Sequence, residues 1–244
     1  MADPDNLFYT AGNVIHIFNV PKSEVSFRRT ALGGGIGNIR TNPNAELKHI
    51  AVAENGNNFG AKPLVVIYEW PTLEIVCVLK GGSTASFTNL DYSPDGSLLV
   101  SQAGEPDYLI TIYDWPRHTI LLRTKSYVND VYRVKFSEKV PGQLCSAGVA
   151  HIKFWKMCNT FTGLKLKGEV GRFGKTEYTD ILGIQPMPDE KRLNVPHSWF
   201  EIHHSKLHDN QVWVILKFYA ESNNKNHIVD GNPLFSQGTR DFMP

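Results

Sequence analysis

One phrase recurs four times along the chain and constrains the fold more than any other feature. In each copy, small residues lead into a β-rich run that closes on an aromatic residue followed by a polar or charged one. The copies are Ala11-Gly12 to Phe18-Asn19, Ala53-Glu54 to Tyr68-Glu69, Ala103-Gly104 to Tyr113-Asp114 and Ala147-Gly148 to Trp155-Lys156. The aromatic residues at 18, 68, 113 and 155 are separated by 50, 45 and 42 residues. A period of about 40–45 residues with such a closing pair is typical of WD40 β-propeller blades.

The second and third copies match almost part for part. Tyr68-Glu69-Trp70-Pro71 aligns with Tyr113-Asp114-Trp115-Pro116, and each stretch ends a β-branched and aromatic run at a proline turn. Helical periodicity is nearly missing from the repeated region. Short strands at even spacing predict an all-β fold, and radial repetition is how such strands avoid open edges. A β-sandwich is the alternative, but a sandwich has no reason to repeat this phrase at this period.

The pattern of apolar runs and turns predicts three or four strands in each unit. We expect them at 7–11, 14–20 and 25–29; at 47–53, 64–70 and 73–79; at 89–92, 97–103, 108–115 and 119–123; and at 131–136, 143–147 and 151–155. The first unit is shorter at its start. We expect Trp155 to pack between blades. Trp70 and Trp115 are expected on the strand face opposite Tyr68 and Tyr113, packed against the next blade.

The repeat divides the chain into three regions. Residues 1–158 are predicted to form about four WD40 blades. Residues 159–191 are predicted to be a glycine- and lysine-rich inter-blade segment, and residues 192–244 a divergent, poorly ordered tail without a fifth copy of the phrase. Propellers typically have 4–8 blades. The sequence therefore predicts a partial propeller with an irregular C-terminal tail.

Composition excludes several classes of protein. The chain has 244 residues, with 41% hydrophobic and 20% charged residues and a net charge of +1, which favours neither nucleic acid nor an anionic membrane as a partner of the whole molecule. It has no apolar run long enough to span a bilayer, and its acidic N-terminus lacks the apolar core of a secretory signal. Three sparse cysteines, Cys77, Cys145 and Cys158, indicate free thiols in a reducing cytoplasm.

A glycine-rich stretch from Gly168 to Thr176 invites a phosphate-binding interpretation. The phosphate loop requires G-x-x-x-x-G-K-[ST], and the first glycine should then stand where Glu169 does. A carboxylate at that position would repel phosphate, and Pro186 and Pro188 prevent a long helix from following. We therefore interpret the stretch as a structural glycine loop and expect no cofactor.

Other candidates for chemistry are equally weak. His197, His203, His204 and His208 cluster in the tail, but no cysteine or carboxylate pair completes a zinc motif. The acids Asp91, Asp95 and Asp114 fall at predicted blade turns, where aspartate hydrogen-bonds the backbone. No nucleophile context such as G-x-S-x-G is present. The sequence predicts a protein that is not an enzyme, with no catalytic, cofactor-binding or metal-binding residues.

Basic residues gather just after the fourth copy of the phrase. Lys165, Lys167, Arg172 and Lys175 stand there against one acid, Glu169. Lysines on strand edges are often solvated and protect an edge from pairing with another chain. The alternative is a basic surface that binds an acidic partner protein. These four residues are the candidate partner-binding site.

The region around the fourth copy also carries a more specific similarity. The runs His151 to Met157, Thr160 to Gly168 and Gly171 to Thr176 resemble the cilia- and flagella-associated protein 44 family of WD40 proteins. Upstream, the runs Tyr9 to Asn13, Ile67 to Glu69 and Pro106 to Ile112 resemble it in the same order. The resemblance covers roughly residues 7–190 and is most specific at Gly171 to Thr176.

The resemblance implies a function as well as a fold. It implies a non-enzymatic scaffold of the motile-cilium axoneme, part of the tether that links inner-arm dynein motor heads to the doublet microtubule, and so a role in ciliary and flagellar beating. Its implied partners are axonemal tether subunits, inner-arm dynein and tubulin, and its implied location is the cytoskeleton of the cilium. A generic cytoplasmic WD40 adaptor is the alternative, and a nucleotide-binding enzyme ranks third.

Overall fold

The computed structural model describes residue 3, residues 5–44, 46–57 and 59–170, and four further short strands. Sheet 1 contains β1 (Asn6–Ala11), β2 (Val14–Asn19) and β3 (Glu24–Arg29). Sheet 2 contains β4 (Ile36–Thr41), β5 (His49–Glu54), β6 (Leu64–Glu69) and β7 (Ile75–Leu79). Sheet 3 contains β8 (Phe87–Tyr92), β9 (Leu98–Ala103), β10 (Leu109–Asp114) and β11 (Thr119–Lys125). Sheet 4 contains β12 (Val131–Phe136), β13 (Gln143–Gly148), β14 (His151–Thr160) and β15 (Gly163–Val170).

The four further strands pair two and two. β16 (Gly183–Pro186) pairs with β19 (Trp213–Leu216), and β17 (Asn194–His197) pairs with β18 (Glu201–His204). β16 also contacts β12 and β13 of sheet 4. The predicted tail beyond residue 192 therefore supplies three of these short strands, and the rest of it lies outside the described residues.

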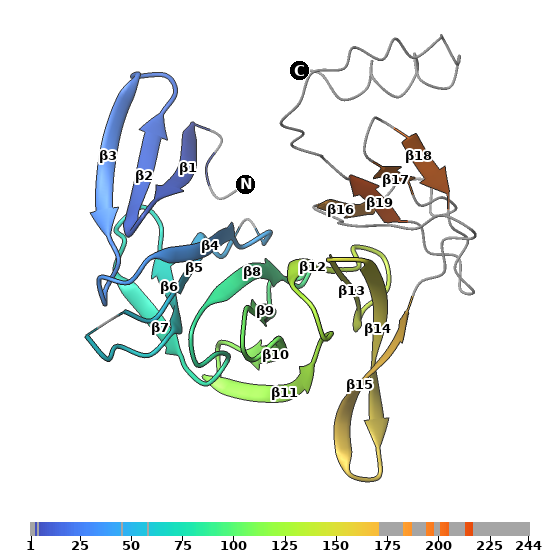
Figure 1. Cartoon of the computed structure of the whole chain (residues 1–244). Coiled ribbons are helices and arrows are strands. Elements are labelled where there is room, and N and C mark those ends of the chain that lie inside the picture. Colours follow the sequence, from blue (N-terminus) through green and yellow to red (C-terminus); the bar gives the residue numbers. More distant parts are fainter. Residues whose placement is uncertain are drawn as a thin grey trace, which may run out of the picture.

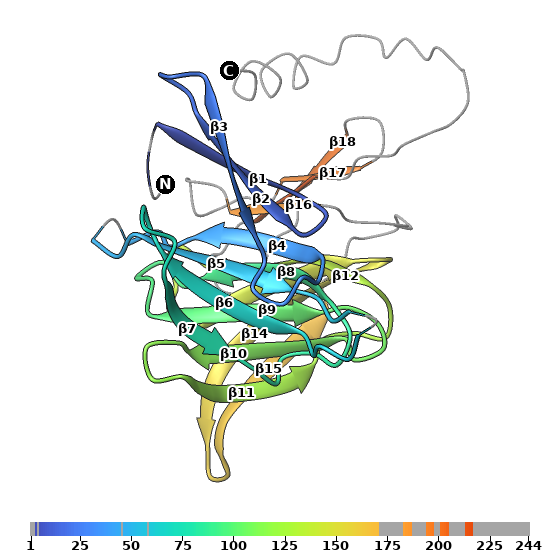
Figure 2. The ribbon, with the colours of Figure 1, turned by 90° about the vertical axis from the view of Figure 1, so that its left-hand side faces the viewer.

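The four sheets are arranged as consecutive blades of a partial propeller (Figure 1). Within each sheet, every strand pairs antiparallel with the next strand along the chain. The first strands β4, β8 and β12 lie side by side, and the later strands of each sheet fan outward from them. In the view rotated by 90° about the vertical axis, the sheets lie as successive layers (Figure 2). The all-β fold and the partial propeller predicted from the repeat are confirmed.

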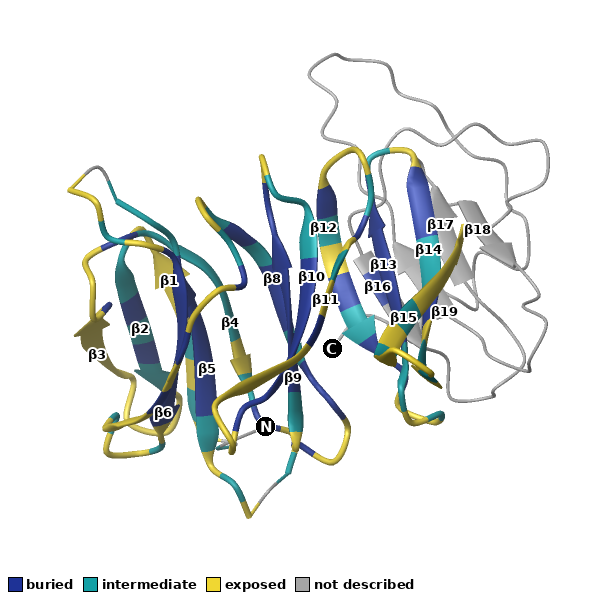
Figure 3. Ribbon diagram, turned by 90° about the horizontal axis from the view of Figure 1, so that it is seen from below, coloured by how far each residue is buried: buried dark blue, intermediate teal, exposed yellow. Residues whose placement is uncertain are grey.

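The alternation of side chains along each strand explains why the sheets stack. On β5, Ala51 and Ala53 face sheet 3, whereas Ile50 and Val52 face sheet 1, and all four are buried. Because both faces carry small or apolar residues, sheet 2 buries both of them. The same holds for sheet 3, whose second face packs on sheet 4 through Val100, with Trp155 opposite it. Burial is continuous through the middle of the molecule (Figure 3).

The closing aromatic of each repeat has one position in the fold. Tyr68, Tyr113 and Trp155 all lie on the third strand of a four-stranded sheet and face the preceding sheet. Trp155 is buried between sheets 3 and 4, as predicted. Phe18 occupies the same slot on β2, so sheet 1 corresponds to the last three strands of a blade, and the described residues give it no counterpart of β4.

The expectation for the other two tryptophans was wrong. Trp115 lies with Tyr113 in the core between sheets 2 and 3, and it contacts His49 of the preceding sheet. Trp70 likewise lies against Phe8 of the preceding sheet, with 4.9 Å between ring centroids. Each tryptophan is two residues beyond the tyrosine, and residues two apart share a strand face.

Two strands differ from the sequence expectation. β4 was not expected, because polar and glycine residues dilute its apolar pattern. The region from 159 was expected to be an inter-blade segment, but β14 extends to Thr160 and β15 completes sheet 4. The alternation of Leu164 and Leu166 with exposed lysines is a half-buried strand pattern, which explains the pairing.

Gly168 on β15 is required by the neighbouring indole ring. A Cβ atom built at Gly168 would lie 2.5 Å from Cε3 of Trp155 and 2.6 Å from Cε of Lys153. The Lys153 ammonium lies 4.0 Å from the indole centroid, so the lysine side chain and the ring both occupy the space beside Gly168. A glycine first noticed as part of a phosphate-loop pattern therefore makes room for the core tryptophan of sheet 4.

We expect Gly168→Ala to lower the free energy of unfolding by about 1–3 kcal/mol, because the added methyl group overlaps the Trp155 ring. Urea denaturation monitored by tryptophan fluorescence measures the change. Gly35→Ala is the matched control, since the nearest atom to its Cβ would be Gly12 O at 3.9 Å. Equal stability of the two variants would contradict the assigned role of Gly168.

The outer face of sheet 1 is apolar and exposed. Leu7 is 58% exposed and Phe27 66% exposed, and Tyr9 and Val25 lie on the same face. Tyr9 stacks on His16 at 4.7 Å, and His16 meets Phe27 edge-on at 4.9 Å. This face is the counterpart of the one that each other blade buries against its predecessor. Contiguous apolar surface of this kind promotes association.

We expect Phe27→Ser to raise the monomeric fraction of the purified chain, because it removes the most exposed ring of this face. The free energy of unfolding should change by less than about 0.5 kcal/mol, since the side chain is mostly in water. Size-exclusion chromatography with light scattering measures the monomer fraction. Phe59→Ser, at a loop residue that is 97% exposed, is the control and should leave association unchanged. A drop in association equal to that of Phe27→Ser would refute the assignment to sheet 1.

Candidate protein-interaction site

Two of the four predicted partner-binding residues are described by the structure. Lys165 and Lys167 lie on β15, and both side chains are exposed. Arg172 and Lys175 lie outside the described residues. The structure therefore brings Lys165 and Lys167 to one face of one strand, and the wider four-residue cluster stays a prediction.

Pairing with β14 adds a lysine that the sequence analysis missed. Lys167 lies directly opposite Lys156, and Lys165 lies opposite Cys158. Residues directly opposite on an antiparallel pair share a face. We call Lys156, Lys165 and Lys167 the basic face, and the hairpin from Lys156 to Lys167 the arm. The signal in the sequence was the matching alternation on both sides of Gly163, which becomes visible once the two strands are paired.

The opposite face of the arm holds it against the blade. Met157, Leu164 and Leu166 are partly buried and pack on the core between sheets 3 and 4, and β15 contacts β11. The Met157 N–H donates to Gly142 O at 2.7 Å. The arm is therefore anchored along its apolar face, which fixes the direction in which its lysines point.

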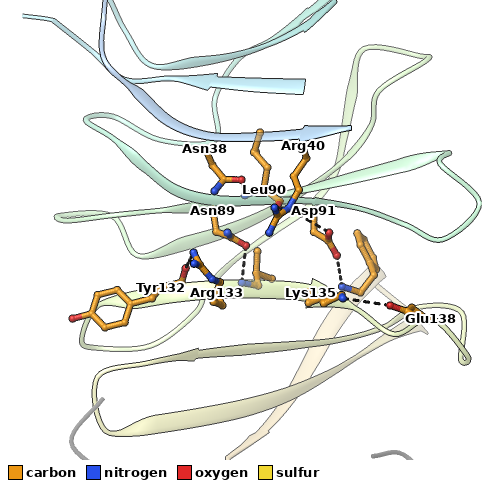
Figure 4. Close-up of polar contacts among 11 residues, drawn as sticks. Asn38, Arg40, Asn89, Leu90, Asp91, Tyr132, Arg133, Lys135 and Glu138 are labelled. Atoms are coloured by element: carbon orange, nitrogen blue, oxygen red, sulfur yellow. Dashed lines mark hydrogen bonds and ion pairs between the residues drawn. The ribbon is translucent and has the colours of Figure 1, made fainter. Parts of the chain in front are cut away.

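A second polar constellation lies along the first strands β4, β8 and β12 (Figure 4). Asn38 Oδ1 accepts a hydrogen bond from Leu90 N at 3.3 Å, and the fully buried Asn89 accepts one from Val134 N at 3.0 Å. Asn38 and Asn89 occupy the same position of successive sheets, each next to a register shift. One side-chain amide thus ties each first strand to the next.

We call this series of side-chain hydrogen bonds between β4, β8 and β12 the side-chain ladder, and charged groups also contribute to it. Asp91 Oδ2 accepts a hydrogen bond from Phe136 N at 2.9 Å, and Arg40 lies 3.9 Å from Asp91 Oδ1 while its Nε donates to Leu90 O at 3.1 Å. Burial raises the pKa of Asp91 to about 6, against the opposing effects of the Phe136 N–H, Arg40 and Lys135. The carboxylate is thus held in an environment that disfavours its charge.

On β12, the first strand of sheet 4, the corresponding position carries a cation instead of an amide. Arg133 stands where β4 and β8 carry asparagine, and its Nη1 donates to Tyr132 O at 3.2 Å. Desolvation, with the nearby Arg40, lowers the pKa of the Arg133 guanidinium. Lys135 pairs with Glu138 at 3.3 Å. The sequence analysis placed Asp91 at a turn and missed Asn38, Asn89 and Arg40, whose role depends on strands that are distant in sequence.

Among the residues that the structure describes, no group of three His, Cys, Asp or Glu side chains could hold a metal ion. That same part of the chain contains no helix long and apolar enough to cross a membrane. Cys77 and Cys145 are buried free thiols, and burial raises the pKa of both.

Stacked antiparallel blades with polar first strands and a projecting basic arm define a partial β-propeller. Relatives carry the assignment further. The chain resembles cilia- and flagella-associated protein 44 of Mus musculus, with 39% identity over 194 residues, or 80% of this chain and 10% of the relative. The protein of the same name from Chlamydomonas reinhardtii is 40% identical over 163 residues, 66% of this chain and 9% of the relative.

The similarity extends to a distant organism. Cilia- and flagella-associated protein 44 of Trypanosoma brucei brucei is 33% identical over 184 residues, 75% of this chain and 10% of the relative. The chain thus spans about a tenth of the length of the curated relatives it matches. No protein-family model matches it. The resemblance predicted from the runs around the fourth repeat is confirmed.

We expect Asp91→Asn to flatten the pH dependence of stability. The pKa of Asp91 is raised in the fold to about 6 from its ordinary value of 3.8, so the wild-type free energy of unfolding should fall as pH rises from about 4 to 6. The asparagine variant should gain about 1–3 kcal/mol relative to wild type across this window, because it carries no charge to desolvate.

Urea denaturation at several pH values measures this difference. Asp5→Asn at the exposed N-terminal turn is the control for the loss of one carboxylate. A stability difference between Asp91→Asn and wild type that stays constant from pH 4 to 7 would rule out the raised pKa.

Proposed function

We propose that this chain is a non-enzymatic WD40 scaffold of the motile-cilium axoneme. The observation that carries the proposal is 33–40% identity to proteins named for cilia and flagella in a mammal, an alga and a trypanosome. The relatives' names specify an organelle and no reaction, which fits a protein without catalytic activity. A location in the cilium or flagellum follows from the same similarity.

Within the axoneme, we infer a role in the tether that joins inner-arm dynein motor heads to the doublet microtubule. The partners would be tether subunits, inner-arm dynein and tubulin. Two features support a scaffold role. The blades bury both faces of sheets 2 and 3, and the side-chain ladder joins β4, β8 and β12, so the fragment is a rigid support. The basic face, with Arg172 and Lys175, would offer a surface to an acidic partner.

We expect the tagged 244-residue chain, expressed in motile ciliated cells, to stay with axonemes after detergent extraction of the membrane. Proximity labelling from the tag should recover inner-arm dynein heavy chains above background. Immunofluorescence and mass spectrometry of the extracted axonemes measure both. Uniform cytoplasmic staining, fully removed by detergent, would favour a generic adaptor instead.

A core variant separates specific retention from trapping of the tag. Ile67→Asp introduces a charge at a fully buried position between sheets 2 and 3, so the blades should not assemble. That variant should be lost on extraction. Labelling of dynein that is equal for wild type and this variant would contradict the proposed tether role.

A further inference from the structure

The arm extends beyond the blade to which it belongs. β14 has ten residues and β15 eight, whereas β12 and β13 have six each. The pairing of β13 with β14 ends at Gln143 and Lys156, so from Met157 onward β14 pairs with β15 alone. Both ribbon views show the hairpin projecting from the stacked sheets (Figures 1 and 2). Two-stranded ribbons are only marginally stable by themselves, so an extension of this kind needs a reason.

The charges on the arm oppose its folding. Lys156 and Lys167 are directly opposite, with Cβ atoms expected about 4.5–5.5 Å apart, and like charges so placed are destabilising. Glu169 lies on the same face of β15, but no ion pair joins it to the three lysines within the described part of the chain. The repulsion would be relieved by an anion that lies along this face.

The tip of the arm adds an apolar group. Phe161, in the turn between the strands, is fully exposed, and the turn is closed by Thr160 Oγ1 donating to Gly163 O at 2.7 Å. An ordered turn that presents one aromatic ring to water is the form of an interface anchor. The arm therefore presents both the positive charge of the basic face and one apolar group, the Phe161 ring.

We propose that the arm binds an extended acidic segment of a partner protein, with carboxylates on the basic face and an apolar side chain against Phe161. Lys165 and Lys167 are two residues apart on a strand, which corresponds to about 6.6 Å. Alternate side chains of an extended peptide have the same spacing, so successive carboxylates of the segment can meet successive ammonium groups. This inference rests on the scaffold function proposed above and names the chemistry of its partner.

A protein partner fits this surface better than a nucleic acid does. Single-stranded nucleic acids are held by aromatic side chains that stack on bases, interleaved with basic groups. The basic face consists of Lys156, Lys165 and Lys167 with Cys158, and its one aromatic neighbour is Phe154 at the blade end. With one ring at the tip and a net charge of +1 for the whole chain, the arm lacks a stacking platform.

The test measures binding of the purified 244-residue chain to two fluorescent peptides by anisotropy. One peptide alternates glutamate with serine and ends in leucine, and the other lacks the leucine. The triple variant Lys156→Glu, Lys165→Glu, Lys167→Glu should weaken binding of both peptides at least about tenfold. Phe161→Ser should weaken the leucine-ended peptide about three- to fivefold and leave the other unchanged.

A matched control carries the same change of charge elsewhere. Lys22→Glu, Lys62→Glu, Lys80→Glu reverses three exposed lysines outside the arm and should alter binding less than about twofold. Thermal melts verify that each variant is folded. If the triple glutamate variant does not fold, the corresponding glutamine variant replaces it, with an expected loss of about threefold or more.

The proposal is overturned if wild type does not bind the peptides, if the control loses as much affinity as the arm variant, or if single-stranded RNA of equal charge binds as tightly. These results leave the scaffold function intact when the tagged chain is still retained on axonemes. Conversely, if the chain binds the peptide but never reaches cilia, the result would support acidic-segment binding by the arm and refute the proposed ciliary location.

Discussion

The structure depends on the packing of each sheet against the sheet before it. The third strand supplies the critical group, a large aromatic that enters this interface, and in sheets 2 and 4 its polar end is satisfied by the second strand of the same sheet. Tyr68 donates to Glu54 at 3.2 Å, and Trp155 Nε1 donates to Ser146 Oγ at 2.9 Å. A buried ring contributes a large apolar area, but its polar atom must keep a partner. The closing aromatic of the repeat therefore stands out in the sequence, because the same residue supplies a large buried apolar area and a polar atom that needs a hydrogen-bond partner.

Polar side chains form the hydrogen bonds between neighbouring sheets that backbone pairing does not provide. Neighbouring first strands belong to different sheets, so their facing N–H groups have no ladder to join, and Asn38, Asn89 and Asp91 accept from them instead. Glu54 does the same at the crossing from sheet 1 to sheet 2. Its carboxylate is fully buried and accepts from Ala31 N at 2.9 Å and Leu32 N at 3.0 Å. These bonds offset the cost of burying charge and fix the blade spacing.

The sequence predicted the parts of the fold in which local pattern and burial agree. The apolar third strands carry the repeat, so the all-β class and the blade order followed from spacing. β4 was missed because a first strand faces polar groups on one side, and the residues of β8 that it contacts lie about fifty residues away. The ladder could not be predicted for the same reason. Lys165 and Lys167 were found by composition, but Lys156 became their neighbour only through the register of β14 with β15.

The arm and the outer face of sheet 1 differ in what their exposure implies. The outer face of sheet 1 obeys the blade pattern: its exposed residues occupy positions that other sheets bury, so exposure there is the expected result where no described sheet packs on that face. The arm departs from the pattern, because no blade position calls for two extended strands, three lysines on one face and a phenylalanine at the tip. The lysines and the phenylalanine make no contribution to the core that the opposite face of the arm packs on, and exposed features that lower local stability in this way are more often functional. The arm is therefore the stronger candidate for a contact specific to this protein, whereas sheet 1 follows from the propeller architecture.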